Sequence, residues 1–127
     1  NTDSETVLVS EGGASCGYVN YINEKIWCGC HCYKLTRSKV LPKYLYYILK
    51  GNQEKIMALR AGAAMPNIKK DAFQNLFLSV DLDKANQMDV VFSLDYIQKT
   101  IDSKTAELSF LDNLVKSRFV NHSKYRL

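Results

Sequence analysis

The last third of the chain carries a heptad repeat, and this repeat restricts the possible folds more than any other feature. Two rows of mostly apolar residues recur at seven-residue spacing, with the second row three places after the first. The first row is Gln87, Leu94, Ile101, Leu108 and Val115, and the second is Val90, Ile97, Lys104, Leu111 and Arg118. Apolar residues at alternating steps of three and four form the stripe along which helices pair. The pattern predicts one long coiled-coil helix over residues 81–120.

The residues expected to pair two such helices are called the seam. They are Leu94, Ile97, Ile101, Lys104, Leu108, Leu111 and Val115. A helix from Lys84 to Val120 would be on the order of 55 Å long at about 1.5 Å per residue. A domain of about 80 residues spans only roughly 25–30 Å, so residues 1–80 are too few to cover the seam and a partner helix is expected. Within the seam, Lys104 is a candidate for setting helix register or partner choice.

The residues before this helix mix strand and helix patterns. Strands are expected over Thr6–Ser10, Tyr18–Ile22, Ile26–Leu35 and Leu76–Val80, and helices from Leu41-Pro42 to Gly51, from Asn52 to Gly62, and over Lys69–Leu76. Because the strands and helices do not alternate in regular βαβ units, this order predicts an α+β fold, with a small mixed α/β N-terminal part and one long C-terminal helix. The predicted domains are residues 1–80, the helix at 81–120, and a flexible tail at 121–127. Asp81 or Asp83 is expected to cap the long helix.

Charge is distributed unevenly between the two parts. Residues 25–70 contain ten Lys/Arg against Glu54 alone, a net charge of +9, whereas residues 81–115 have a net charge of −4. This asymmetry indicates a polyanionic partner for the N-terminal part and a protein partner for the helix. The alternative from charge alone is that these lysines only solvate a surface.

Four cysteines raise the question of zinc or disulfides. Cys28, Cys30 and Cys32 alternate within the expected strand, which would place them on one face about 6.5–7 Å apart. A straight strand cannot wrap three thiols around a tetrahedral zinc ion. We therefore expect no metal and, in reducing buffer, no disulfide, with these residues and Cys16 serving as small buried side chains in a reducing cytosol.

No catalytic constellation is present in the sequence. His31 and His122 are the only histidines, and no serine occupies a G-x-S-x-G turn. The chain is therefore predicted not to be an enzyme. It has no apolar run long enough for a membrane span and no signal peptide, so a cytoplasmic location without membrane association is expected.

Ahead of the long helix, the chain contains a series of short segments in a fixed order: Val7–Ser10, Gly12–Ser15, Gly17–Val19, Trp27–Leu35, Lys43–Leu49, Arg60–Ala63, Ile68 and Phe73–Leu78. In this order they resemble the DNA specificity subunit of type I restriction-modification systems. This order is similar to one target recognition domain and its conserved helix, to about Phe119. In this family a Pro-Pro-Leu-x-x-Gln motif leads into the long helix. Residues Val80 to Gln87 occupy this position here, where Leu82 and Gln87 match the motif and the two prolines are absent.

The resemblance implies one N-terminally incomplete recognition domain, where a full subunit has two such domains and two helices. It implies a non-catalytic module that directs methyltransferase and restriction subunits to a bipartite site in double-stranded DNA. Its helix would pair with a second specificity half or with another copy. No cofactor is expected on this chain, since S-adenosylmethionine, magnesium and ATP would belong to the partner subunits.

Polar and basic residues near expected loops are the candidates for DNA contact. They are Ser15, Tyr18, Lys34, Arg37, Lys39, Asn67, Lys69 and Lys70. Lys and Arg would contact phosphates, while Ser15, Tyr18 or Asn67 would contact base edges. Two alternatives stay open: a non-catalytic coiled-coil scaffold whose basic part binds RNA or an acidic protein, and an inactive truncated specificity subunit.

Overall fold

The computed structural model describes Thr2 and residues 4–122, with side chains up to Val120. The chain divides into two compact units, Asn1–Val91 and Phe92–Leu127. We call the first unit the head. The predicted flexible tail falls largely on residues 123–127, which lie outside the described residues.

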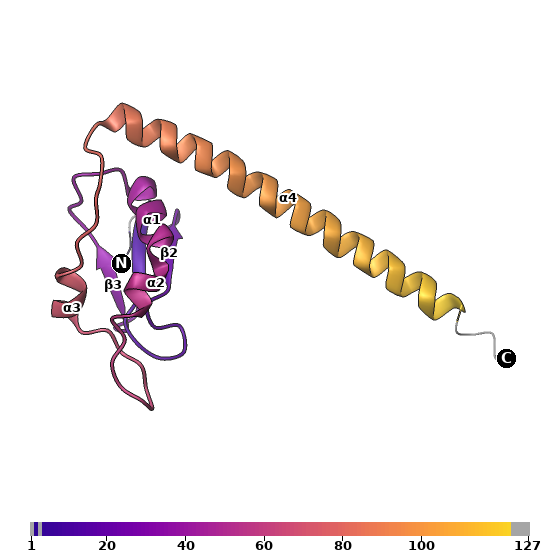
Figure 1. Cartoon of the computed structure of the whole chain (residues 1–127), viewed down its shortest axis with the longest axis horizontal. Helices are drawn as coiled ribbons and strands as arrows, with labels where there is room; N and C mark the ends of the chain where they lie inside the picture. The colour runs from indigo at the N-terminus through magenta and orange to yellow at the C-terminus, as the bar shows by residue number, and fades with distance from the viewer. Residues whose placement is uncertain (1, 3, 123–127) are drawn as a thin grey trace. The chain divides into compact units, whose positions relative to one another are not determined.

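A three-stranded antiparallel sheet forms the centre of the head (Figure 1). Its strands are β1 (Thr6–Ser10), β2 (Val19–Ile22) and β3 (Cys32–Leu35), in the order β2-β1-β3. The β-branched and apolar residues of β1 suit its central, buried position. Val7 and Val9 point into the core, where they meet Val19 of β2 and Leu49 and Ile56 of the helices.

Four helices complete the described chain: α1 (Pro42–Gly51), α2 (Gln53–Met57), α3 (Lys70–Gln74) and α4 (Lys84–His122). Pro42 occupies the first turn of α1, where its missing N–H is no loss. Leu45 and Leu49, four residues apart, direct one face of α1 onto the sheet. The predicted α+β class and the long C-terminal helix are therefore confirmed.

Several predicted boundaries are wrong. Residues 23–31 form a loop instead of the first half of a strand, and residues 76–80, expected to be a strand, pair with no strand in the described chain. The second helix ends at Met57 and not at Gly62, and Asn52 at its N-cap donates its side-chain amide backwards to the Ile48 carbonyl.

The start of α4 belongs to the head, which extends to Val91. Asp83 caps the helix as expected, because its Oδ1 accepts a hydrogen bond of 2.8 Å from the Ala85 amide. Gln87 is fully buried (0% exposed) and does not join the coiled-coil seam. Its Oε1 accepts from the Leu41 amide at 2.8 Å and its Nε2 donates to the Asp81 carbonyl at 2.7 Å. The heptad row that begins at Gln87 therefore starts inside the head.

Candidate nucleic-acid interface

A loop rich in glycine joins β1 to β2 and carries Ser15 near its tip. Its base is closed by a hydrogen bond of 2.8 Å from the Gly17 amide to the Ser10 carbonyl. Gly13 and Gly17 adopt φ angles of 76° and 79°, which residues with a Cβ adopt rarely. Ser15 is exposed. The loop therefore presents the Ser15 hydroxyl on a defined turn.

Two side chains after the first helix hold this loop in place. The Gln53 amide accepts from the Val19 N–H at 3.2 Å and donates to the Gly17 carbonyl. Arg60 donates from Nε to the Cys16 carbonyl at 2.9 Å. The sequence did not identify Gln53 or Arg60 as part of the site, because neither belongs to a local motif and both act across more than thirty residues.

A second loop lies beside the glycine loop and carries Asn67. The Gly13 amide donates to the Pro66 carbonyl at 3.0 Å, so the loops of Ser15 and Asn67 are in direct contact. Lys69 and Lys70 follow at once, and both are exposed. The structure therefore brings together four of the predicted DNA-binding residues at one end of the sheet, which we call the loop end: Ser15, Asn67, Lys69 and Lys70.

A hollow of about 400 Å³ lies at the loop end. Its lining residues are Gly12, Gly13, His31, Met65, Pro66 and Asn67. Next to it, the Tyr33 hydroxyl donates to the Ile68 carbonyl at 2.7 Å. Partial burial, and then the negative charge of Glu11, raise the pKa of Tyr33 above its ordinary value. The phenol therefore stays protonated, and able to donate, through neutral pH.

Tyr18 belongs to a different surface, formed by α1 and the edge strand β2. Lys50 Nζ lies 4.8 Å from the centroid of the Tyr18 ring, and Lys43 Nζ lies 5.5 Å from that of Tyr21. Residues 43 and 50 are seven apart on α1 and share one helix face. Neither lysine was predicted as a contact residue, because the pairing with tyrosine depends on the packing of α1 against β2.

The remaining basic candidates lie at the opposite end of the sheet. β3 runs antiparallel to β1 from the Ser10–Cys32 pair to the Val7–Leu35 pair, so Arg37 and Lys39 emerge far from the loop end. Lys34 pairs with Leu8 in mid-strand. Lys34 and Arg37 line a second hollow of about 320 Å³, which Glu5 also lines. The eight predicted residues thus occupy three places on the head and not one.

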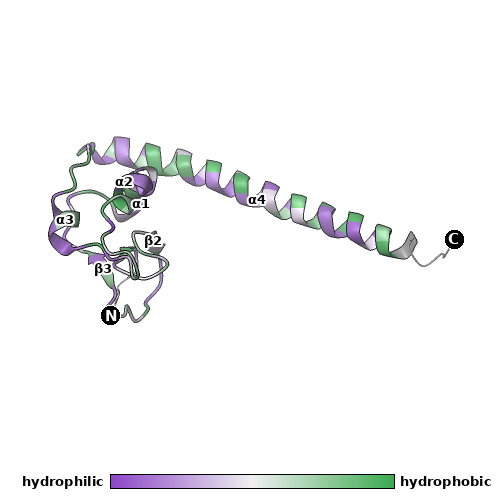
Figure 2. Ribbon diagram, turned by 60° about the horizontal axis from the view of Figure 1, so that its bottom comes forward, coloured by the Kyte–Doolittle hydropathy of each residue, from purple (hydrophilic) through white to green (hydrophobic). Residues whose placement is uncertain are grey.

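The seam of α4 is exposed apart from half-buried Leu94. Its other apolar side chains are 46–67% exposed. Lys104 is also exposed and forms an ion pair of 3.2 Å with Glu107. Figure 2 shows hydrophobic residues recurring along the whole of α4.

A second apolar stripe runs along α4, on a different face from the seam. It consists of Phe92, Tyr96, Phe110 and Leu114, which are 44–77% exposed. At about 100° per residue these four lie within about 40° of one another, and well over 90° from the centre of the seam. The heptad pattern did not reveal this stripe, because its members are not seven residues apart throughout.

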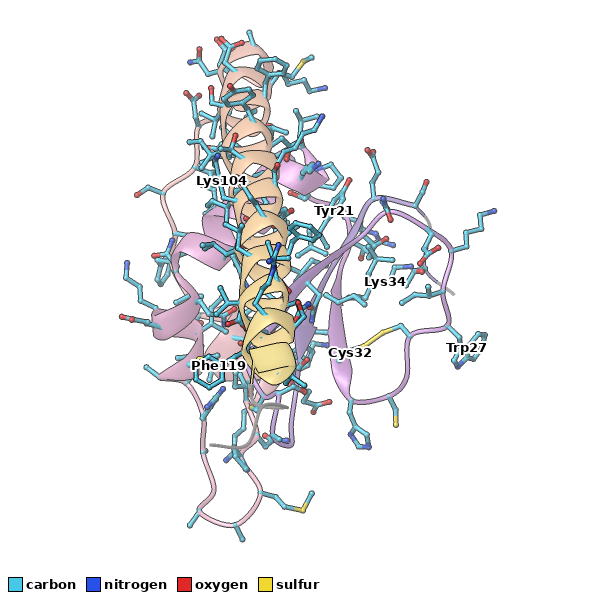
Figure 3. All side chains as sticks on the ribbon, turned by 90° about the vertical axis from the view of Figure 1, so that its right-hand side faces the viewer. Tyr21, Trp27, Cys32, Lys34, Lys104 and Phe119 are labelled. Atoms are coloured by element: carbon cyan, nitrogen blue, oxygen red, sulfur yellow. A yellow bond between two sulfur atoms is a disulfide. The ribbon has the colours of Figure 1, made fainter. Side chains whose placement is uncertain are left out.

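The prediction of buried, unbonded cysteines is wrong for three of the four. Because residues 23–31 form a loop, Cys28 and Cys32 are not held apart on a strand, and the two are joined by a disulfide. Cys30 lies between them as a free, exposed thiol, whereas Cys16 is free and buried. Figure 3 shows the sulfur–sulfur bond at Cys32, with the Trp27 side chain directed away from the loop. Trp27 is 82% exposed.

Among the described residues, no cluster of three His, Cys, Asp or Glu side chains has the arrangement to hold a metal ion. None of the helices described in the structure is both long and apolar enough to cross a membrane.

Comparison with known proteins gives a consistent result. Residues 1–112 match the model of the type I restriction modification DNA specificity domain. A Mycoplasma genitalium protein named as a type I specificity subunit is 30% identical over 106 residues, covering 81% of this chain and 27% of the relative. A counterpart from Mycoplasma pneumoniae is 29% identical over 105 residues, covering 80% of this chain and 28% of that protein.

A solved structure of the same kind of protein has a similar fold. The crystal structure of the type I restriction-modification S subunit from M. genitalium superposes with a TM-score of 0.68 at 29% identity. The match covers 81% of this chain and 28% of the other. The chain thus spans little more than a quarter of the length of these relatives.

Proposed function

The chain belongs to the type I restriction-modification DNA specificity family, and from this premise we propose that its head recognises one half of a bipartite site in double-stranded DNA. The observation that carries the proposal is the loop end, where two loops from distant parts of the sequence are hydrogen-bonded together beside Lys69 and Lys70. Exposed side chains on a fixed backbone can contact base edges in a defined position, and the lysines beside them can bind the phosphates of the DNA backbone. Recognition of this kind needs no catalytic group on the chain.

The exposed seam supports association through α4. Leaving several large apolar side chains in water costs about 1.5–3 kcal/mol each relative to burial. We propose that the seam pairs with the helix of a second specificity half or of another copy, in antiparallel orientation.

The second stripe of α4 supports further partners. A helix with apolar residues on two faces is suited to the interior of a helical assembly and not to a simple pair. We propose that Phe92, Tyr96, Phe110 and Leu114 contact the methyltransferase or restriction subunits. Those subunits would carry the S-adenosylmethionine, magnesium and ATP, and the complex would act in the cytoplasm.

The test is the exchange of recognition segments. A full-length specificity subunit that contains this segment is reconstituted with its methyltransferase subunit, and the methylated DNA sequence is determined. Exchange of residues 10–70 for those of a relative should change one half of the methylated sequence. An unchanged sequence would show that the head does not recognise DNA.

The same complex separates the alternatives. Binding to duplex DNA that weakens steeply with salt and prefers one sequence supports the proposal. Equal binding to RNA or to an acidic protein would instead support a scaffold. A folded head without any sequence preference would indicate an inactive specificity subunit.

A further inference from the structure

The hollow at the loop end combines an apolar lining with one side-chain amide. Gly12, Gly13, Met65 and Pro66 supply the apolar part, and Met65 is 76% exposed. Asn67 supplies the amide, and His31 borders the hollow as a second polar side chain.

The backbone around Asn67 is fixed from both sides. Its N–H donates to the Ala61 carbonyl at 2.9 Å, and its carbonyl accepts from the Ala61 N–H at 2.8 Å. The next residue, Ile68, is fully buried, and its N–H donates to the Glu11 carbonyl at 2.8 Å. The turn before Asn67 requires glycine at position 62, because its φ is 94° and a Cβ there would lie 2.9 Å from the Met65 carbonyl oxygen. The Asn67 side chain is thus mounted on a backbone with little freedom.

All these bonds use the backbone, and the side-chain amide of Asn67 takes no part in them. Within the described residues, no hydrogen bond to this exposed amide is found. An amide on a fixed backbone, with its donor and its acceptor free of protein partners, suits a ligand that offers one of each. Binding would order only the side chain of Asn67, because its backbone is already held in place.

Only one base edge in the major groove of DNA fits both parts of the hollow. Adenine offers an acceptor at N7 and a donor at N6, which an asparagine amide pairs with bidentately. Guanine offers two acceptors and cytosine one donor, so each leaves part of the amide unpaired. The thymine opposite adenine carries a methyl group suited to an apolar contact. Lys69 and Lys70 follow Asn67 directly and supply charge for the flanking phosphates.

We propose that Asn67 and Met65 recognise one A·T base pair in the half-site, through the Asn67 amide on adenine and the Met65 side chain on the thymine methyl. The inference rests on the proposed function of the head. It goes beyond that function by assigning an A·T base pair to the hollow at the loop end.

The experiment uses the full-length specificity subunit with its methyltransferase, once the methylated sequence has identified the half-site. Duplexes carry 7-deazaadenine in place of each adenine in turn, which removes the N7 acceptor, or deoxyuridine in place of each thymine, which removes the methyl group. At one A·T pair, 7-deazaadenine should weaken binding by about tenfold or more. Deoxyuridine at the same pair should weaken it about fourfold.

Two variants assign these effects to side chains. The Asn67→Ala complex should bind weakly and no longer distinguish 7-deazaadenine from adenine at that pair. The Met65→Ala complex should lose only its preference for thymine over deoxyuridine. Asn20→Ala, an exposed asparagine on β2 that does not line the hollow, is the matched control and should keep both preferences.

Folding is checked separately, since the side chains of Asn67 and Met65 make no bond that holds the loop. Unchanged thermal unfolding of both variants is therefore expected. If Asn67→Ala keeps the wild-type response to 7-deazaadenine at every adenine while methylation stays sequence-specific, the inference is wrong and the proposed function stands. If the wild-type complex shows no sequence preference at all, the proposed function and the inference both fail.

Discussion

Replacement of Gln87 by leucine tests the anchoring of α4 to the head. The Gln87 side chain is fully buried, and it bonds the Leu41 amide at 2.8 Å and the Asp81 carbonyl at 2.7 Å. Leucine has a similar volume and keeps the helix, so the substitution removes the two hydrogen bonds without opening a large cavity. The change in the free energy of unfolding therefore measures the loss of the two hydrogen bonds, together with the cost of leaving the Leu41 N–H and the Asp81 carbonyl without their partner.

The expected loss of stability depends on how exposed Leu41 and Asp81, the two hydrogen-bond partners of Gln87, are to water. Leu41 is half-buried, so its unpaired N–H costs about 1–3 kcal/mol. Asp81 is exposed, so water replaces the lost bond at its carbonyl and the loss is about 0.5–1.5 kcal/mol. The sum is about 1.5–4.5 kcal/mol, a large part of the roughly 5–15 kcal/mol of a typical domain. At about 4–8 °C per kcal/mol for a domain of this size, we expect Tm to fall by about 6–36 °C.

The assay is thermal unfolding followed by near-ultraviolet circular dichroism. Six of the eight tyrosines lie before residue 80, so this signal reports on the head, whereas far-ultraviolet ellipticity is dominated by α4. The matched control is Gln98→Leu, an exposed position whose amide bonds only Asp102 at 2.9 Å. We expect the control to change stability by less than about 0.5 kcal/mol. Equal melting of the two variants would refute the anchoring role of Gln87.

Four other changes test the remaining features. Ile101→Asp with Leu108→Asp should give monomers in sedimentation, and an unchanged oligomer would mean that the seam does not pair. Lys69→Ala should weaken binding to all duplexes alike and reduce the slope of log K against log salt by about 0.9; a sequence-dependent loss would argue against a phosphate contact. Gly17→Ala should destabilise the head, since its φ is 79° and its Cβ would lie 3.2 Å from a buried side chain; wild-type stability would contradict this. Burial and then the charge of Glu11 raise the pKa of Tyr33, so the stability that it contributes is complete below the unfolded pKa of about 10 and is lost as pH rises through the higher folded pKa. Tyr33→Phe should flatten this alkaline fall in Tm, and an unchanged profile would count against a raised pKa at Tyr33.

Features that depend on local sequence were predicted correctly. The helical periodicity of residues 84–120 and the cap at Asp83 arise from neighbours within a few turns, so both are visible in the chain. The same periodicity did not show that Gln87 is buried in the head. A residue at helical spacing faces a partner, but the spacing does not say whether that partner is another helix or the chain's own α1.

Strands were predicted less well, because a strand needs a neighbour with free backbone groups. Residues 26–31 have an alternating pattern, but β1 ends at Ser10, opposite Cys32, and the chain then turns into the glycine loop. Beyond that point the Glu11 N–H bonds the His31 carbonyl and the Thr2 N–H bonds the Ile26 carbonyl, but these separate bonds do not extend the ladder of β3. Leu76 and Leu78 instead pack against the core without a strand partner.

The candidate site was predicted only as separate residues. Ser15 and Asn67 lie about fifty positions apart in the chain, and the bond between Gly13 and Pro66 that joins their loops has no local signal. The division of the basic residues between opposite ends of the sheet was also hidden, because it depends on the antiparallel register of β3 on β1.

The way in which the glycine loop is held determines which of its positions tolerate mutation. Gln53 and Arg60 bond only backbone atoms at the base of the loop, and Gly17 has no room for a side chain. Ala14 and Ser15 at the tip are exposed. New side chains at the tip therefore alter the surface without disturbing the frame that supports it. Libraries designed to change the DNA preference of this protein should randomise residues 14 and 15 and leave residues 16 and 17, Gln53 and Arg60 unchanged.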